Sequence, residues 1–253
     1  MLVQINEANQ TIRMVSIPRD LFVNRRKINE YYALYGADYF TRLITDLTGF
    51  SIDHTMFVDM LAFVDLIDAM GGVDVTLSTP LVDPTYRTVD AGKEGTLYYE
   101  IGTHHLGGIE ALRLARSRHT TSDFSRSERQ QLIFKAMLAK ARSFELGSAR
   151  SIAGLLKTIL TKTDTSFTFS EALSYYYRYQ SYSVDRTSVL STANVLTSPP
   201  YILLADCQRM IEEAMRHARP IPDCLDHPHA YTLIPLNDDW DLIRNYIKEV
   251  FNG

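Results

Sequence analysis

The sequence lacks an excess of positive charge. Its 253 residues include 26 lysines and arginines against 30 aspartates and glutamates, which gives a formal net charge of -4 at pH 7. A nucleic-acid-binding domain normally shows its basic face in the charge balance of the whole domain. The balance therefore argues against a protein that binds nucleic acid, and the lack of a helix-turn-helix pattern argues against a transcription regulator.

Long apolar runs are also missing. No segment approaches the roughly 18 apolar residues that a membrane-spanning helix needs, and the opening residues MLVQINEANQ lack the basic and apolar regions of a signal peptide. The composition is otherwise ordinary for a folded globular protein, with 45% hydrophobic and 22% charged residues. The chain as given is therefore expected to be soluble and to bury a substantial core.

Cysteine and histidine are too sparse to indicate a metal site. The two cysteines, Cys207 and Cys224, are compatible with a disulfide in an exported protein or with two unrelated free thiols, and their spacing does not decide between these. Neither the histidine pair at residues 104–105 nor the histidines within residues 226–229 form a complete set of metal ligands at a familiar spacing. These histidines are expected on the surface.

Strand-like and helix-like patterns alternate along the chain. Residues 2–6 and 12–17 are expected to form a hairpin, and residues 55–58 and 73–77 to form further strands. Residues 78–103 have the prolines and glycines of a loop or a β-ribbon. Helices are expected at residues 29–49, 61–70, 106–114, 125–144, 152–160, 170–179, 206–217 and 238–251. Strands interleaved with helices imply a layered α/β fold.

One segment concentrates positive charge in this acidic chain. From Arg113 to Gln131 the sequence reads RLARSRHTTSDFSRSERQQ. Ser125 and Glu128 have the spacing of a capping box, just before an apolar run. Arg126 is then expected at the first helical position, on one face with Gln130, where backbone amides and the helix dipole favour an anion. The segment predicts a site for a phosphate or pyrophosphate.

The same arginines have a simpler interpretation. They are also compatible with a solvated helix and loop in which they pair with Glu110, Asp123 and Glu128. Composition and spacing alone leave both interpretations open.

Several motifs in order along the chain carry a family resemblance. They are SIPRD at residues 16–20, KIN at 27–29, DLIDAMGGVDV at 65–75, and then LGGIEALRLARSR and DFSRSERQQ. Together they resemble the LytR-CpsA-Psr family, and the likeness covers roughly residues 1–190 and the ending TLIPLNDDWDLIRNYIKEVF. The resemblance implies a three-layer α/β/α fold with a central mixed β-sheet flanked by helices. It also implies a single catalytic domain over residues 1–253, in which the proline-rich, cysteine-containing segment near 188–230 is less typical.

The resemblance also implies an activity and a location. Members of the family are phosphotransferases that move a glycan phosphate from a polyprenyl-pyrophosphate carrier onto peptidoglycan or another cell-wall acceptor. They work at the extracytoplasmic face of the cell membrane, which they approach through an anchor and through the lipid carrier, and magnesium usually assists. Export favours the disulfide between Cys207 and Cys224.

Site residues follow from the family's motifs, position by position. Catalysis is expected from Arg19, Arg118 and Arg126. Pyrophosphate binding is expected from Arg19, Arg116, Arg118, Arg126 and Gln130, with support from Lys27, Asn29, Asp123 and Arg129. The chemistry agrees, since a pyrophosphate suits the fixed fork of donors that arginine supplies and lysine does not.

The chain departs from the family's pattern at its start. The family's two aspartates that resemble magnesium ligands are expected before Met1, so no metal ligand is assigned here and magnesium binding is expected to be weak or absent. Retained arginines without these carboxylates also suit an alternative, a non-catalytic protein that binds polyprenyl (pyro)phosphate or a glycan lipid. For the lipid tail, the candidate walls of an apolar tunnel are Met56, Phe57, Leu61, Phe63, Val64, Ile67, Ile133, Phe134, Met137 and Leu138.

Overall fold

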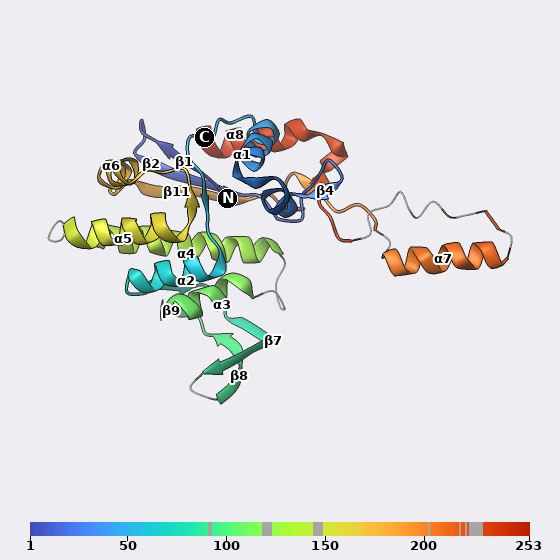
Figure 1. Ribbon diagram of the computed structural model, residues 1–253, viewed down its shortest axis with the longest axis horizontal. Coiled ribbons are helices and arrows are strands. Elements are labelled where there is room, and N and C mark those ends of the chain that lie inside the picture. Colours follow the sequence, from blue (N-terminus) through green and yellow to red (C-terminus); the bar gives the residue numbers. More distant parts are fainter. Residues whose placement is uncertain are drawn as a thin grey trace. The chain divides into compact units, whose positions relative to one another are not determined.

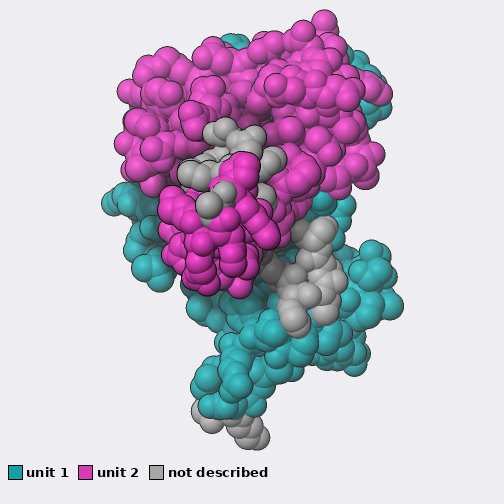
Figure 2. Space-filling view, turned by 90° about the vertical axis from the view of Figure 1, so that its right-hand side faces the viewer, with its two compact units in different colours: residues 1–16, 51–189, 250–253 teal, residues 17–50, 190–249 magenta. Residues whose placement is uncertain are grey.

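The computed structural model describes residues 1–90, 93–117, 123–143, 149–201, 203–217, 219–220, 222 and 230–253. The chain divides into two compact units, each built from separate stretches of sequence (Figure 2). Unit 1 comprises residues 1–16, 51–189 and 250–253, and unit 2 comprises residues 17–50 and 190–249. The single catalytic domain expected over residues 1–253 stays a prediction.

Unit 1 contains a mixed three-stranded sheet. Strand β1 (Leu2–Asn6) pairs antiparallel with β2 (Thr11–Ser16), which confirms the predicted hairpin, and β11 (Ser183–Val189) lies parallel to β2 on its other side. The order is therefore β1-β2-β11. A parallel partner from so far along the chain requires the intervening helices to cross over the sheet.

The central strand β2 presents different side chains to the two faces of this sheet. Ile12 and Met14 are buried with Tyr182, and Phe134 and Leu138 of α4 (Asp123–Ser143) pack against them. Figure 1 shows α4 running along the sheet. Alternation along a strand sends Arg13 to the opposite face, where its Nη1 donates to the Phe251 carbonyl in the last turn of α8 (Trp240–Asn252) at 2.6 Å. The α/β fold with a mixed sheet between helices is confirmed.

Arg13 is buried on this face with a carboxylate partner. Its guanidinium donates to Asp185 of β11, with Nη2–Oδ2 at 3.0 Å and Nε–Oδ1 at 3.2 Å. Burial, the largest effect on this carboxyl group, raises its pKa. The hydrogen bond and charge of Arg13 outweigh burial and leave the pKa of Asp185 below its ordinary value.

Asp185 is expected to make the protein acid-sensitive. Because its pKa is lower in the folded than in the unfolded state, its stabilisation is complete above the unfolded pKa of about 3.9 and is lost as the pH falls through the folded pKa. Asp185→Asn should lower the free energy of unfolding at neutral pH by about 1 to 3 kcal/mol, because the buried Arg13 loses its charged partner. Urea unfolding between about pH 7 and pH 2 should show this difference shrinking below about pH 4. A difference that stays constant with pH would contradict the assignment, and Asp241→Asn, in an exposed pair with Arg244, is the control.

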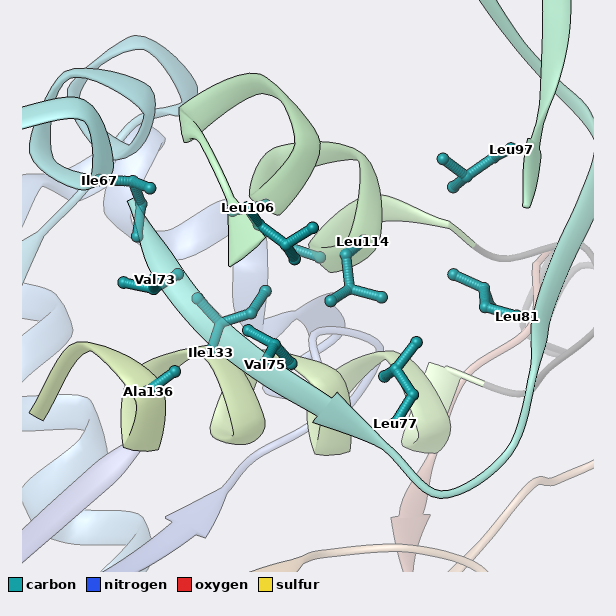
Figure 3. Packing of buried hydrophobic residues seen from close by; sticks show 12 residues of the cluster. Ile67, Val73, Val75, Leu77, Leu81, Leu97, Leu106, Leu114, Ile133 and Ala136 are labelled. Atoms are coloured by element: carbon teal, nitrogen blue, oxygen red, sulfur yellow. The ribbon is translucent and has the colours of Figure 1, made fainter. Parts of the chain in front are cut away.

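Besides the hydrophobic cluster on the sheet, unit 1 has a second hydrophobic core, which lies between three helices and an antiparallel pair of strands. It is formed by α2 (Met60–Ala69), β6 (Val73–Leu77), β9 (Gly102–Leu106), α3 (Gly108–Arg116) and α4. Along β6 the side chains of Val73, Val75 and Leu77 alternate inward, as predicted, and Figure 3 shows them in one cluster with Leu114 and Ile133. This core joins α3 to α4, the two helices that carry the arginine-rich segment.

The region predicted as a loop or β-ribbon is a long hairpin followed by a strand. Strands β7 (Leu81–Asp90) and β8 (Lys93–Tyr99) pair antiparallel, and Figure 1 shows them projecting beyond α3. Leu81 and Leu97 at the base of the hairpin belong to the second core. The hairpin register shifts between Asp83 and Arg87, which marks a bulge there. The strand β9 was not predicted, and α3 begins after it.

The remaining elements are short strands and peripheral helices. Unit 1 adds β5 (Met56–Phe57), β10 (Asp164–Thr165), α5 (Ala149–Lys162) and α6 (Phe169–Tyr179). Unit 2 contains β3 (Phe22–Val23), β4 (Arg26–Lys27), α1 (Ile28–Thr48), β12 (Leu196–Thr197), α7 (Leu204–Arg216), β13 (Ile234–Pro235) and a 3-10 turn (Leu236–Asp238), together with most of α8. Within the described residues, no helix has the length and apolar character needed to cross a membrane.

Candidate anion-binding site

The helix that carries Arg126 starts earlier than predicted. Helix α4 begins at Asp123, so Ser125 lies inside its first turn and the capping box predicted from Ser125 and Glu128 is wrong. A capping side chain must stand on the residue before the first helical position, because it accepts from the amides of the following turn. Arg126 is consequently the fourth residue of the helix rather than the first. The anion site must therefore be argued from side chains rather than from free amides at a helix start.

Arg126 and Gln130 lie on the outer side of α4. Gln130 is exposed and Arg126 is half-buried, whereas Ser127 and Arg129 are buried. The Nε2 of Gln130 lies 3.5 Å from the carbonyl oxygen of Ala115, near the end of α3. The predicted shared face of Arg126 and Gln130 is therefore present, and it lies beside the last turn of α3.

Arg129 is part of the interior. Its side chain is 6% exposed, and it donates to the carbonyl of Leu114 at 3.1 Å and to the carbonyl of Ser117. Burial lowers the pKa of Arg129, the neighbouring charge of Arg126 lowers it further, and the charge of Asp83 opposes both. Carbonyls in the last turn of a helix have no partner within the helix. Arg129 supplies one for α3 and so fixes the end of α3 to the start of α4.

Arg116 lies at the junction of α3 and α4, where Arg129 joins the two helices. It is the last residue of α3 and is exposed, between the buried residues Ala115 and Ser117. The structure thus brings Arg116 to the same junction as Arg126 and Gln130. Arg118 lies outside the described residues, and so does the side chain of Asp123, the first residue of α4.

A second cationic group lies in unit 2, around the SIPRD and KIN motifs. Asp20 is 3% exposed and accepts from Lys27 Nζ at 2.6 Å and from Arg19 Nε at 3.4 Å. The amide of Asn29 lies 3.4 Å from the carbonyl of Arg19. Arg19, Lys27 and Asn29 therefore lie together, and a buried carboxylate holds the two cations in place. The side chain of Arg19 keeps 43% of its surface exposed.

Sequence reasoning missed several residues that hold these groups. Besides Asp20, Gln131 of α4 is buried and its Nε2 donates to Ser16 Oγ at 2.9 Å and to the Ser188 carbonyl at 2.6 Å. Gln131 therefore connects α4 to the ends of the parallel strands β2 and β11. Helix α4 has little amphipathic periodicity, so no sequence pattern marked Gln131 as buried.

The apolar residues predicted to wall a lipid tunnel do not share one environment. Ile67 and Ile133 are fully buried in the second core, and Phe63 and Met137 pack against it. Phe134 and Leu138 instead pack against the sheet, while Met56 and Leu61 are 43% and 77% exposed. Ordinary packing accounts for the buried members, so the tunnel stays a prediction.

The described residues cover only part of what the expected magnesium binding and the expected disulfide between Cys207 and Cys224 involve. Within those residues, no group of three or more histidine, cysteine, aspartate or glutamate side chains is arranged to hold a metal ion. Magnesium binding stays a prediction. Cys207 is buried on α7 and is disulfide-bonded, while Cys224 lies outside the described residues.

The fold and the arginine groups define an α/β protein with candidate anion-binding surfaces, and solved structures share this fold. The crystal structure of B. subtilis TagV matches 99% of this chain and 87% of its own, with a TM-score of 0.71 at 22% identity. The structure of TagT bound to LI-WTA matches 99% of this chain and 83% of its own, with a TM-score of 0.65 at 18% identity. At these identities the likeness establishes the fold.

The sequence establishes the family. The LytR_cpsA_psr family model matches residues 1–212, and the chain belongs to this family. TagV of Bacillus subtilis (strain 168), a polyisoprenyl-teichoic acid–peptidoglycan teichoic acid transferase, is 30% identical over 203 residues, covering 75% of this chain and 50% of TagV. TagU of Halalkalibacterium halodurans, which bears the same description, is 34% identical over 148 residues, covering 55% of this chain and 45% of TagU. The chain spans about half the length of the curated relatives it matches.

Proposed function

We propose that this protein transfers a glycan phosphate from a polyprenyl-pyrophosphate carrier to a cell-wall acceptor such as peptidoglycan. The observation that carries the proposal is the junction of α3 and α4. There Arg116, Arg126 and Gln130 stand on an outer surface while the buried Arg129 holds the two helices together. The names of the TagT, TagU and TagV relatives, which describe transfer of teichoic acid to peptidoglycan, support the acceptor class.

The proposed reaction is a phosphoryl transfer. The acceptor hydroxyl attacks the phosphorus that bears the sugar and loses its proton. The bond from that phosphorus to the bridging oxygen breaks, and polyprenyl phosphate leaves. Positive charge is required because negative charge accumulates on the phosphate oxygens as the bond breaks. Exposed guanidinium groups can donate to several of these oxygens at once. Arg126 is the donor to which we assign this role in unit 1, and Arg19, held by Asp20, is a separate candidate donor in unit 2.

The location and the ion are part of the same proposal. A polyprenyl carrier resides in a membrane, so the protein is proposed to work at a membrane surface, on the extracytoplasmic face where cell-wall acceptors lie. Magnesium is proposed as an ion supplied to the reaction, with no described residue assigned to hold it.

Transfer by the chain itself tests the proposal. The protein is incubated with a short-chain polyprenyl-pyrophosphate glycan, peptidoglycan fragments and Mg²⁺, and the release of polyprenyl phosphate and the labelling of peptidoglycan are measured. The proposal expects both products in equal amounts. Binding of the lipid without either product would replace the transferase proposal with a non-catalytic polyprenyl-pyrophosphate-binding function. The absence of both binding and transfer would contradict both functions.

A further inference from the structure

Asp83 is a buried carboxylate in unit 1 that lies outside the cationic motifs. It stands on β7, at the bulge near the base of the β7–β8 hairpin, and is 2% exposed. A buried carboxylate is costly unless hydrogen bonds replace the water it has lost. The partners of Asp83 therefore indicate what it holds in place.

The two oxygens of Asp83 contact different parts of the fold. Oδ1 accepts from the Thr85 amide at 3.2 Å, the Thr85 hydroxyl at 2.9 Å and the Tyr86 amide at 3.0 Å, which closes the turn within β7. Oδ2 accepts from the Ser117 hydroxyl at 2.7 Å. One carboxylate thus connects the hairpin to the residue that follows α3.

Ser117 is held from two sides. It is fully buried at the C-terminal end of α3, with φ -54° and ψ 138°, so the chain leaves the helix at this residue. Its hydroxyl donates to Asp83 of β7, and its carbonyl accepts from Arg129 of α4. Ser117 lies directly between Arg116 and Arg118 in the sequence. These two hydrogen bonds fix the end of α3, and with it the placement of Arg116 on the last turn of that helix.

We propose that Asp83 is a positioning residue that, through Ser117, places Arg116 at the end of α3 for binding a pyrophosphate group. The inference rests on the proposed function. A site that binds a highly charged group needs its donors held within a fraction of an ångström, which supporting hydrogen bonds achieve. Asp83 also places a negative charge beside Arg129, opposing the effect of Arg126 on its pKa.

The test measures binding of inorganic pyrophosphate to the whole chain by isothermal titration calorimetry. Ser117→Ala removes the hydroxyl that donates to Asp83 and is expected to weaken binding about five- to tenfold. The loss of this buried hydrogen bond should also lower the thermal midpoint, so a thermal melt checks that the variant is folded at the temperature of the titration. Asp83→Asn should have a similar effect. Thr85→Ala is the matched control, because it removes a different hydrogen bond of the same carboxylate and is expected to change affinity less than twofold.

A positioning role further predicts that the effects are not additive. In an Arg116→Ala background, Ser117→Ala should weaken the remaining binding less than twofold, because the residue it places is gone. An equal fold-loss in both backgrounds, or wild-type affinity in the Ser117→Ala protein, would overturn the inference. Those outcomes leave the proposed function intact if Arg126→Ala still weakens binding. A wild-type chain that does not bind pyrophosphate would contradict both the positioning role of Asp83 and the proposed function.

Discussion

Arg126→Ala and Arg19→Ala are each expected to weaken binding of a short-chain polyprenyl pyrophosphate by about 10- to 150-fold. Each change removes charge-assisted hydrogen bonds of about 1.5 to 3 kcal/mol, and about 1.4 kcal/mol corresponds to a tenfold change in affinity. Arg126 is half-buried on the outer side of α4 and Arg19 is 43% exposed, so both variants should keep the fold. Calorimetric titration measures the loss, with a thermal melt of each variant as a check on folding.

Two controls separate a specific site from general electrostatic attraction. Arg87→Ala removes the same charge from a hairpin position that is 85% exposed, where Arg87 Nη1 lies 3.9 Å from Glu94 Oε2 in an exposed pair. It should leave affinity almost unchanged. Arg126→Lys keeps the charge but loses the planar fork of donors, so an intermediate affinity is expected. If alanine at position 19 or 126 weakens binding no more than alanine at position 87, the assignment of these arginines fails.

Gly108→Ala is expected to destabilise the protein by about 3 kcal/mol or more, because it adds a methyl group where α3 packs directly on α2. A Cβ at this position would lie 2.4 Å from the Val64 carbonyl oxygen and 2.8 Å from the Val64 Cα. These are backbone atoms, so the two helices must separate to admit it. The Gly108 amide also donates to Asp68 Oδ1 at 2.7 Å, and this hydrogen bond would be strained by the same movement.

Gly154→Ala is the matched control for this prediction. Gly154 lies inside α5, and a Cβ added there meets no atom within 4 Å. Alanine is favoured over glycine in a helix interior, so this variant should gain about 0.5 to 1 kcal/mol. Thermal and urea unfolding of both variants should move in opposite directions. A Gly108→Ala protein as stable as the wild type would contradict the close packing of α2 and α3.

Local patterns in the sequence predicted the α/β fold well, and predicted what holds the site much less well. The hairpin of residues 2–6 and 12–17 and the alternating strand at 73–77 follow from periodicity, which depends only on neighbouring residues. The start of α4 was misplaced because Ser125 and Glu128 have capping-box spacing, although the helix already begins at Asp123. A short motif identifies a possible cap but does not exclude an earlier start.

Arg129 and Asp83 show two different limits on what the sequence alone predicts about a residue's role. Arg129 stands one helical turn before the buried Ile133, but α4 has little amphipathic periodicity and Ile133 is flanked by Leu132 and Phe134, so the sequence pattern did not show that Arg129 faces inward. The family's motif had suggested a supporting role without that distinction. Asp83 contacts Ser117 across two intervening strands and a helix, and no local pattern indicates such a contact. Positions that depend on tertiary packing become visible only once the strands and helices are placed.

The parallel pairing of β2 with β11 has a consequence for how the chain folds. Arg13 and Asp185, which join these strands, are 172 residues apart in sequence. One edge of β2 can pair with β1 as soon as the hairpin is made, but its other edge has no partner until residue 183 is available. Contacts of such long range are slow to form because a large loop must close first. The sheet of unit 1 is therefore expected to be completed late in folding, and a chain ending before residue 183 should expose an open strand edge and aggregate.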